Sequence, residues 1–273
     1  MRFALRWVDM KTAVLTVLLA FAGAAPVVGA DNWVLVWSDD FNYRGLPDPT
    51  KWDYEVGFVR NHEQQYYTRA RLENARVENG VLIIECRKEE FKLSKGGPAH
   101  YTSASLFTRD PAGWLYGRIE VRAKLPSGRG VWPAIWTLGV DFPKVAWPYC
   151  GEIDILEYVG KVPNSVHAAV HYQVSGKHKM DARDRPTESP YDDFHTYAIE
   201  WYPDRIDFFF DGEKHHTFAV DKAGTGADNP FRKPHRLLID FALGGSWGGD
   251  IDDSALPQQF LIKYVRYYRS AGG

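Results

Sequence analysis

The most constraining feature of the sequence is a series of short apolar runs, each bounded by glycine, proline, asparagine or aspartate. Runs of this kind predict β-strands. Residues 117–125 show the alternation of charged with apolar or small side chains that a half-buried strand requires. Sustained helical periodicity is scarce. The predicted strands are residues 81–86, 116–125, 166–172, 196–201, 205–210, 237–243 and 260–268.

Many short strands in one uninterrupted region predict an all-β fold, a β-sandwich or jelly roll of two antiparallel sheets. The dipeptide Asp211-Gly212 joins residues 205–210 to residues 214–220 and predicts a tight hairpin. No linker or fixed-period repeat divides residues 31–273, which we interpret as one domain. A curved inner sheet in such a sandwich provides a long concave cleft suited to a polymer chain.

Residues 1–30 are predicted to be a secretory signal peptide. Positive charges come first, residues 13–25 form a small-apolar run, and residues 28–30 resemble a cleavage site. A membrane anchor is the alternative, but Pro26 ends the run well short of the ~20 residues that a span needs. Met10 is an alternative start. We therefore expect a secreted or periplasmic protein that leaves the membrane once the signal is cleaved.

The charge and cysteine content limit which ligands and macromolecular partners this chain can bind. The chain has 33 basic and 35 acidic residues and no basic stripe, which excludes a nucleic-acid partner. Cys86 and Cys150 are the only cysteines; two isolated buried thiols are favoured over a disulfide, and no second ligand pair accompanies them to bind a metal. We expect a monomer that requires no cofactor.

Three acids lie within six residues of the segment GEIDILEY, residues 151–158. Strict alternation would send Glu157 to the core face, away from Glu152 and Asp154, where an unpaired carboxylate is unfavourable. A β-bulge of one extra residue returns it to their face. The two glutamates would then stand about 13 Å apart at Cα. Their carboxyls could approach to about 5–5.5 Å, the separation of a retaining glycosidase. A solvated acidic edge strand is the alternative.

Aromatic and polar groups elsewhere fit a sugar-binding site. Trp and Tyr stack on sugar rings, and both are abundant here. His171 ends an apolar strand and could reach the acidic face, and residues 61–67 supply amide and aromatic groups. Four tryptophans stand in Gly/Pro-rich surroundings that predict loops or sheet edges: Trp132, Trp136, Trp147 and Trp247.

Taken together, these stretches resemble the bacterial laminarinase-type members of glycoside hydrolase family 16. The resemblance spans roughly residues 33–269 and implies a β-jelly roll with endo-hydrolysis of β-glucan and retention of anomeric configuration. The matching stretches are WSDDFN at 37–42, NHEQQYYT at 61–68, YTSASLFTR at 101–109, YGRIEVRAKLPSGRGVWPAIWTLG at 116–139, GEIDILEYVG at 151–160, VHAAVHY at 166–172, FHTYAIEW at 194–201 and LGGSWGG at 243–249.

The resemblance assigns the roles that the residue pattern leaves open. It implies that Glu152 is the nucleophile, that Asp154 is its hydrogen-bonding assistant and that Glu157 is the general acid/base. The extra residue resembles the laminarinase branch, since lichenases carry the last glutamate at the position of Leu156. The residues implied to bind substrate are Asn61, Trp132, Trp136, His171 and Trp247. Alternatives are a core role for Trp136 and a neighbour-satisfying role for His171.

Some positions depart from the family pattern. Many relatives hold a structural calcium with an acid where this chain has Lys263, whose charge would repel or replace the cation. Asp40 and Asp211 are the acids that could supply oxygens to a structural calcium, which is kept as an alternative to a site without metal. His195 matches a common family position and is interpreted as structural support.

We expect an endo-1,3-β-glucanase acting on laminarin-like β-glucan by double displacement. A mixed-linkage 1,3-1,4-β-glucan, a galactan such as agar, or transglycosylation would use the same site. A non-catalytic glucan-binding lectin is the alternative from another class, and the intact acidic motif argues against it. A structural cell-wall protein is a further alternative, but the sequence shows no repeat, anchor or sorting signal that would support it.

Overall fold

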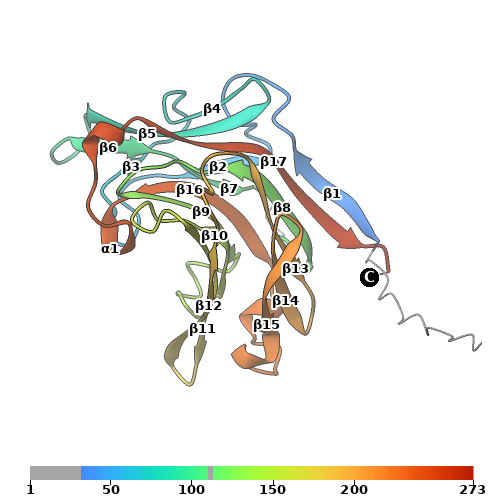
Figure 1. The fold of residues 1–273 in the computed structure, drawn as a ribbon. Coiled ribbons are helices and arrows are strands. Elements are labelled where there is room, and N and C mark those ends of the chain that lie inside the picture. Colours follow the sequence, from blue (N-terminus) through green and yellow to red (C-terminus); the bar gives the residue numbers. More distant parts are fainter. Residues whose placement is uncertain (1–31, 110–112, 273) are drawn as a thin grey trace, which may run out of the picture. The chain divides into compact units, whose positions relative to one another are not determined.

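Two sheets pack face to face in the computed structural model, which describes residues 32–109 and 113–272 (Figure 1). The predicted signal peptide, residues 1–30, lies outside the described residues. Within the described part of the chain, no helix is long and apolar enough to cross a membrane. The described residues from Asn32 onward form one compact unit.

The larger sheet has ten strands, in the order β15-β14-β13-β8-β17-β5-β6-β3, with β1 on β17 and β4 on β5. All its pairings are antiparallel except that of β3 with β6. The strands are β1 (Trp33–Asp39), β3 (Tyr66–Tyr67), β4 (Ala75–Glu78), β5 (Val81–Phe91), β6 (Ala99–Ser103), β8 (Gly117–Lys124), β13 (His195–Trp201), β14 (Arg205–Phe210), β15 (Glu213–Ala219) and β17 (Gln258–Ser270).

The smaller, seven-stranded sheet is fully antiparallel, in the order β12-β11-β10-β9-β16-β7-β2. Its strands are β2 (Trp52–Glu55), β7 (Ser105–Thr108), β9 (Val131–Gly139), β10 (Glu152–Glu157), β11 (Ser165–Val174), β12 (Lys177–Pro186) and β16 (His235–Leu243). The helical turns are η1 (Val220–Ala223), η2 (Pro230–Arg232), α1 (Gly245–Gly248) and η3 (Asp253–Ala255). The prediction of a two-sheet antiparallel sandwich is confirmed.

Alternation along the strands builds the core between the sheets. On β8, Ile119, Val121 and Ala123 are buried in it, while the intervening charged residues are half-buried on the other face. The predicted strands all form, most of them a few residues longer than predicted. The predicted hairpin also forms, because Asp211 and Gly212 both adopt the positive φ that a tight turn between twisted strands requires.

The structure corrects the placement of two tryptophans. Trp132 and Trp136 were expected in loops or at sheet edges, but both lie inside β9, which pairs with β10 on one side and β16 on the other. Every residue of β9 is buried because alternate side chains face the core and the concave face of the sheet. The neighbouring glycines and prolines belong to the turns around this strand. Trp147 does lie in a loop, and Trp247 lies in α1.

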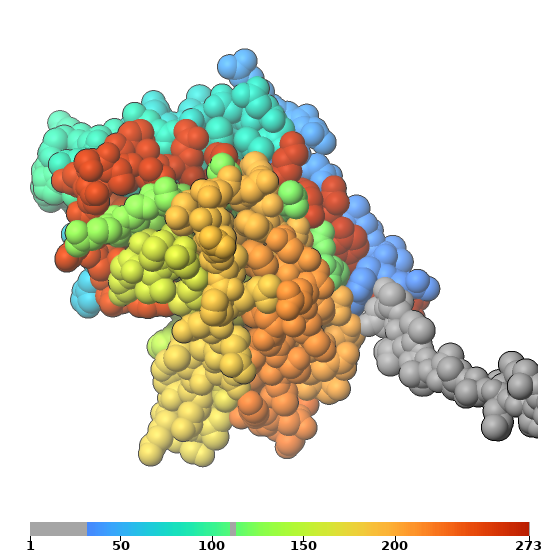
Figure 2. All heavy atoms as spheres, viewed as in Figure 1, coloured from blue at the N-terminus to red at the C-terminus, as the bar shows by residue number. Residues whose placement is uncertain are grey.

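The edge strand β12 was not predicted. Its sequence, KHKMDARDRP, carries no apolar alternation, yet it pairs with β11 in unbroken register over ten residues. An edge strand needs only one partner, and a charged edge resists pairing with another chain. The β11–β12 hairpin (yellow) lies at the surface, and its strand β12 contacts β15 (orange; Figure 2).

The residues named for calcium do not fit a calcium site. The Lys263 ammonium donates to the Gly80 carbonyl at 3.0 Å. Asp40 pairs with Arg266 at 2.7 Å, and Asp211 accepts from His195 and from the Thr196 amide. The two acids are thus engaged by separate partners among the described residues. Cys86 and Cys150 are free and buried, which confirms the prediction of isolated thiols.

Two adjacent aspartates allow a matched test of the fold. Asp39 is 2% exposed and accepts from the Phe41 amide, the Tyr43 hydroxyl and the Trp52 indole. Asp39→Ala leaves these donors unpaired and should cost about 3 kcal/mol, lowering Tm by about 6–12 °C. Asp40→Ala breaks only a half-exposed surface ion pair with Arg266 and should cost less than about 1 kcal/mol. Calorimetry of both variants checks this, and equal losses would contradict it.

Candidate active site

The acidic strand β10 carries the predicted β-bulge. Its pairing with β11 shifts by one residue between Asp154 and Glu157, and its pairing with β9 shifts between Asp154 and Leu156. Ile155 and Leu156 are therefore both buried in the core, although they are consecutive. The bulge returns Glu157 to the face of Glu152 and Asp154, so the prediction of a bulge is confirmed.

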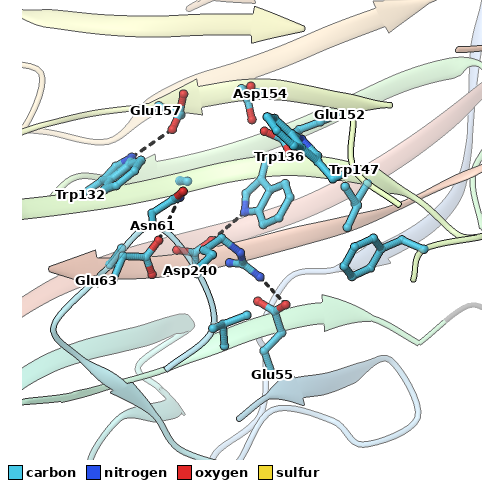
Figure 3. A pocket seen from close by; sticks show the side chains of 16 residues that line it. Glu55, Asn61, Glu63, Trp132, Trp136, Trp147, Glu152, Asp154, Glu157 and Asp240 are labelled. Carbon is cyan, nitrogen blue, oxygen red and sulfur yellow. Dashed lines mark hydrogen bonds and ion pairs between the residues drawn. The ribbon is translucent and has the colours of Figure 1, made fainter. Parts of the chain in front are cut away.

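The three acids share a cavity of about 320 Å³ on the concave face of the smaller sheet (Figure 3). Asp154 is buried, and Glu152 and Glu157 are half-buried. Sixteen described residues line the cavity: Glu55, Val59, Arg60, Asn61, Glu63, Trp132, Ala134, Trp136, Leu138, Phe142, Trp147, Glu152, Asp154, Glu157, Asp240 and Ala242.

The structure brings the predicted substrate-binding residues around these acids. Asn61, Trp132 and Trp136 line the cavity directly. Trp247 stands just outside the lining and packs edge-on against Trp132, with ring centroids 5.5 Å apart. On β11, the His171 Nε2 atom lies 3.3 Å from an Asp154 oxygen.

His195 lies away from this group. It sits on β13 of the larger sheet, stacks on Phe210 and holds Asp211 through its Nδ1 atom at 2.6 Å. This placement agrees with the interpretation of His195 as structural support.

A second set of buried polar groups was missed. Asp240 of β16 accepts from the Trp136 indole at 2.6 Å and from the Tyr67 hydroxyl at 2.8 Å. Glu63 is 7% exposed and accepts from Asn61, Gln65 and Tyr67. One charged residue inside the apolar run 237–243 was the available signal for Asp240. The network fixes the Trp136 ring in the wall of the cavity.

Arg60 is the only cation among the described residues that line the cavity. Its guanidinium forms an ion pair with Glu55 and lies 4.8 Å from the centre of the Trp136 ring, so that it also clamps this tryptophan. Six carboxyl groups line the same cavity. The site therefore carries an excess of acids over cations.

Burial raises the pKa of all three acids on β10. Desolvation raises the pKa of Glu152 to about 8, helped by the charge of Asp154 and opposed by His171 and Arg60. Desolvation also raises the pKa of Asp154. Desolvation and the charges of Asp154 and Glu152 also raise the pKa of Glu157, although the Trp132 indole donates to it at 3.0 Å.

The two glutamates have different neighbours. Like charges in one buried site cannot all ionise, so the cluster loses its protons in steps. The charges of Asp154 and Glu152 favour the protonated form of Glu157, as a general acid requires, while Arg60 favours the ionised form of Glu152. The same two environments suit a proton donor and a nucleophile.

One group of potential metal-ligand atoms comes together among the described residues, formed by Glu152, Asp154 and His171 within 4.8 Å of one another. The β10–β11 register places His171 opposite Glu152, and its Nε2 atom lies 3.3 Å from Asp154 Oδ2, so strand pairing alone accounts for this spacing. We therefore treat these residues as an acid–base cluster and assign no metal to them.

Because the pKa of Glu157 is raised in the folded state, we expect this carboxyl group to lower the free energy of unfolding as the pH rises. A carboxyl whose pKa is higher in the folded state stabilises the fold fully at low pH and loses that contribution as pH rises. Glu157→Gln keeps the oxygen that accepts from Trp132 and removes the titration. We expect its Tm to exceed the wild-type value at pH 8 by at least about 2–4 °C, and the difference to vanish near pH 4.

Calorimetry at both pH values checks this prediction. Glu213→Gln is the control, because Glu213 is exposed and its pKa is lowered by Arg185. That variant should show no gain at pH 8. A Glu157→Gln protein no more stable than the wild type at pH 8 would contradict the assigned environment.

Comparison with known proteins gives one consistent family. The family model described as Glycosyl hydrolases family 16 matches residues 62–266. A Beta-glucanase of Rhodothermus marinus is 47% identical over 254 residues, covering 88% of this chain and 86% of the relative. A Glucan endo-1,3-beta-glucosidase of Cryptopygus antarcticus is 34% identical, covering 94% of this chain and 98% of the relative.

A solved structure agrees with these relatives. The X-ray structure of the laminarinase from Rhodothermus marinus matches with a TM-score of 0.79 at 47% identity, covering 88% of this chain and 99% of that one. Sequence motifs, sheet architecture and the bulged acidic strand therefore lead to the same assignment. The chain belongs to glycosyl hydrolases family 16.

Proposed function

We propose that this protein is a retaining endo-1,3-β-glucanase that acts on laminarin-like chains. The observation that carries the proposal is the bulge in β10, which gathers Glu152, Asp154 and Glu157 on one face of one cavity. Relatives named as a laminarinase and as a glucan endo-1,3-beta-glucosidase, which this chain matches over most of their length, support the substrate.

In the proposed mechanism, Glu152 attacks the anomeric carbon from the face opposite the leaving oxygen. Glu157 protonates that oxygen as the bond breaks, since a sugar alkoxide is a poor leaving group. The glycosyl–enzyme ester is then hydrolysed by water that Glu157 deprotonates, and the original configuration returns. Asp154 stands between the glutamates, and its charge raises the pKa of both. The two carboxyl groups suffice for this chemistry, so no cofactor is invoked.

The cavity suits a neutral sugar chain. Trp132, Trp136 and Trp147 supply faces on which sugar rings can stack, and Trp147 is 43% exposed. The excess of lining carboxyls disfavours sulfated or uronic glycans through like-charge repulsion. Binding along several rings then helps to distort the ring at the reacting centre.

We further propose that the protein is exported and acts as a monomer. The charged and apolar pattern of residues 1–30 supports export. All of the groups needed for the reaction come from one chain, which supports a monomer.

Product analysis tests the substrate. The purified protein is incubated separately with laminarin, lichenan and agarose, and products are followed by chromatography and by NMR of the anomeric protons. We expect rapid release of mixed 1,3-linked oligosaccharides from laminarin that initially carry the β configuration. Cleavage of agarose alone would overturn the substrate, and folded protein that binds glucan without cleaving it would favour the lectin alternative.

Variants test the two roles separately. Glu152→Gln and Glu157→Gln should each fold and lose at least ~10²–10⁴-fold in kcat, while Asp154→Asn should lose less. With an activated aryl glucoside, azide should rescue Glu152→Ala with an α-glycosyl azide product and Glu157→Ala with a β-glycosyl azide. Near-wild-type turnover in either glutamine variant, or exchanged azide products, would contradict the assignment.

A further inference from the structure

His178 of the surface strand β12 contacts the histidine beside the catalytic strand. The His171 Nδ1 and His178 Nε2 atoms are 2.9 Å apart, and the two rings stack with centroids 5.2 Å apart at 14°. The β11–β12 register pairs His171 with Met180 and Gln173 with His178, so the histidines are diagonal neighbours on one face of the hairpin. Trp147 packs on the His178 ring at 4.7 Å.

On its other side, His171 faces a buried oxygen. Its Nε2 atom lies 3.3 Å from Asp154 Oδ2, and this oxygen has no hydrogen bond among the described residues. Buried polar atoms are nearly always hydrogen-bonded, so a donor at this position has a strong energetic role. Three side chains therefore form a line from the buried Asp154 through His171 to the exposed His178.

We propose that His178 is a positioning residue that fixes the tautomer of His171 and so directs a ring proton at Asp154. A neutral imidazole has one donor and one acceptor nitrogen. If His178 Nε2–H donates, His171 Nδ1 accepts, and the proton of His171 must lie on Nε2, toward the carboxylate. The opposite tautomer would set a lone pair against Asp154. The kinetic part of this inference rests on the proposed glucanase function.

The charges around the two histidines agree with a hydrogen bond donated by His178 to His171. Desolvation and the nearby His171 lower the pKa of His178, which keeps His178 neutral and able to share one proton with its neighbour. His171 faces Glu152 and Asp154 from β10, Trp147 from the β9–β10 loop and His178 from β12. The groups that act on Asp154 are His171, Glu152, Glu157 and, from β16, Asp240.

The tautomer of His171 influences the pKa of the two glutamates through the charge of Asp154. The charge of Asp154 raises the pKa of both Glu152 and Glu157. A proton donated by His171 favours the ionised form of Asp154, so this influence on the glutamates is kept. When His171 presents a lone pair instead, Asp154 is stabilised in its protonated form and Glu157 gives up its proton at a lower pH.

Two variants of His178 separate hydrogen bonding from packing. His178→Phe keeps an aromatic ring against Trp147 and removes the hydrogen bond to His171. His178→Gln restores an N–H donor without the ring. Lys179→Gln is the matched control, because Lys179 is the next exposed residue of β12 and its side chain alternates to the other face.

The first readout is the tautomer of His171, measured by long-range ¹H–¹⁵N NMR of the histidine rings. We expect the Nε2–H form in the wild type, His178→Gln and Lys179→Gln, and a tautomer mixture in His178→Phe. The Nδ1–H form in the wild type, or an unchanged His171 in His178→Phe, would overturn the proposal. This readout does not depend on glucanase activity.

The second readout is the pH dependence of kcat/KM on laminarin. In His178→Phe the alkaline limb should move down by about half a pH unit, which is about a threefold change in the protonated fraction. His178→Gln should restore most of the shift, and Lys179→Gln should match the wild type. Superimposable wild-type and His178→Phe profiles would overturn the inference, whereas an inactive wild type would overturn only the proposed function.

Discussion

Three carboxyl groups can share one face of β10 only because this strand carries one residue more than its partners. The extra residue also fixes the core, since Ile155 and Leu156 are both buried there. Removing the bulge would turn Glu157 toward apolar side chains or Leu156 toward the cleft. Fold and site are thus linked at one backbone irregularity, and every later feature of the cavity depends on it.

The bulge places several buried carboxyl groups close together, and groups on the surrounding strands offset part of the repulsion between them. The charge of Asp154 raises the pKa of both glutamates on β10, and the charge of Asp240, a buried carboxyl on β16, raises the pKa of Asp154. Arg60 favours the ionised form of Glu152, the Trp132 indole favours that of Glu157, and His171 favours both. A site of this kind lowers stability and is tolerated because a large apolar core supports it. The uneven distribution of these groups gives Glu152 and Glu157 different chemistry.

Much of this arrangement follows from the sequence. Alternation in residues 117–125 and the Asp211-Gly212 turn predict the sandwich, and the mismatch in GEIDILE predicts the bulge. Polar β12 was missed because its pairing depends on its partner strand and not on its own pattern. Trp132 and Trp136 were misplaced because local glycines and prolines do not reveal that β9 has one face in the core and one in the cleft. The contact of His178 with His171 depends on the register of that unpredicted strand.

The central claim is that Glu152 forms a covalent bond with the sugar while Glu157 handles the proton. Trapping the intermediate tests it most directly. The wild type is incubated with a 2-deoxy-2-fluoro-laminaribiosyl fluoride, which slows hydrolysis of the glycosyl–enzyme, and the adduct is located by intact-mass and peptide mass spectrometry. We expect one added disaccharide, attached to Glu152. A label on Glu157, or no label on an enzyme that hydrolyses laminarin, would contradict the account.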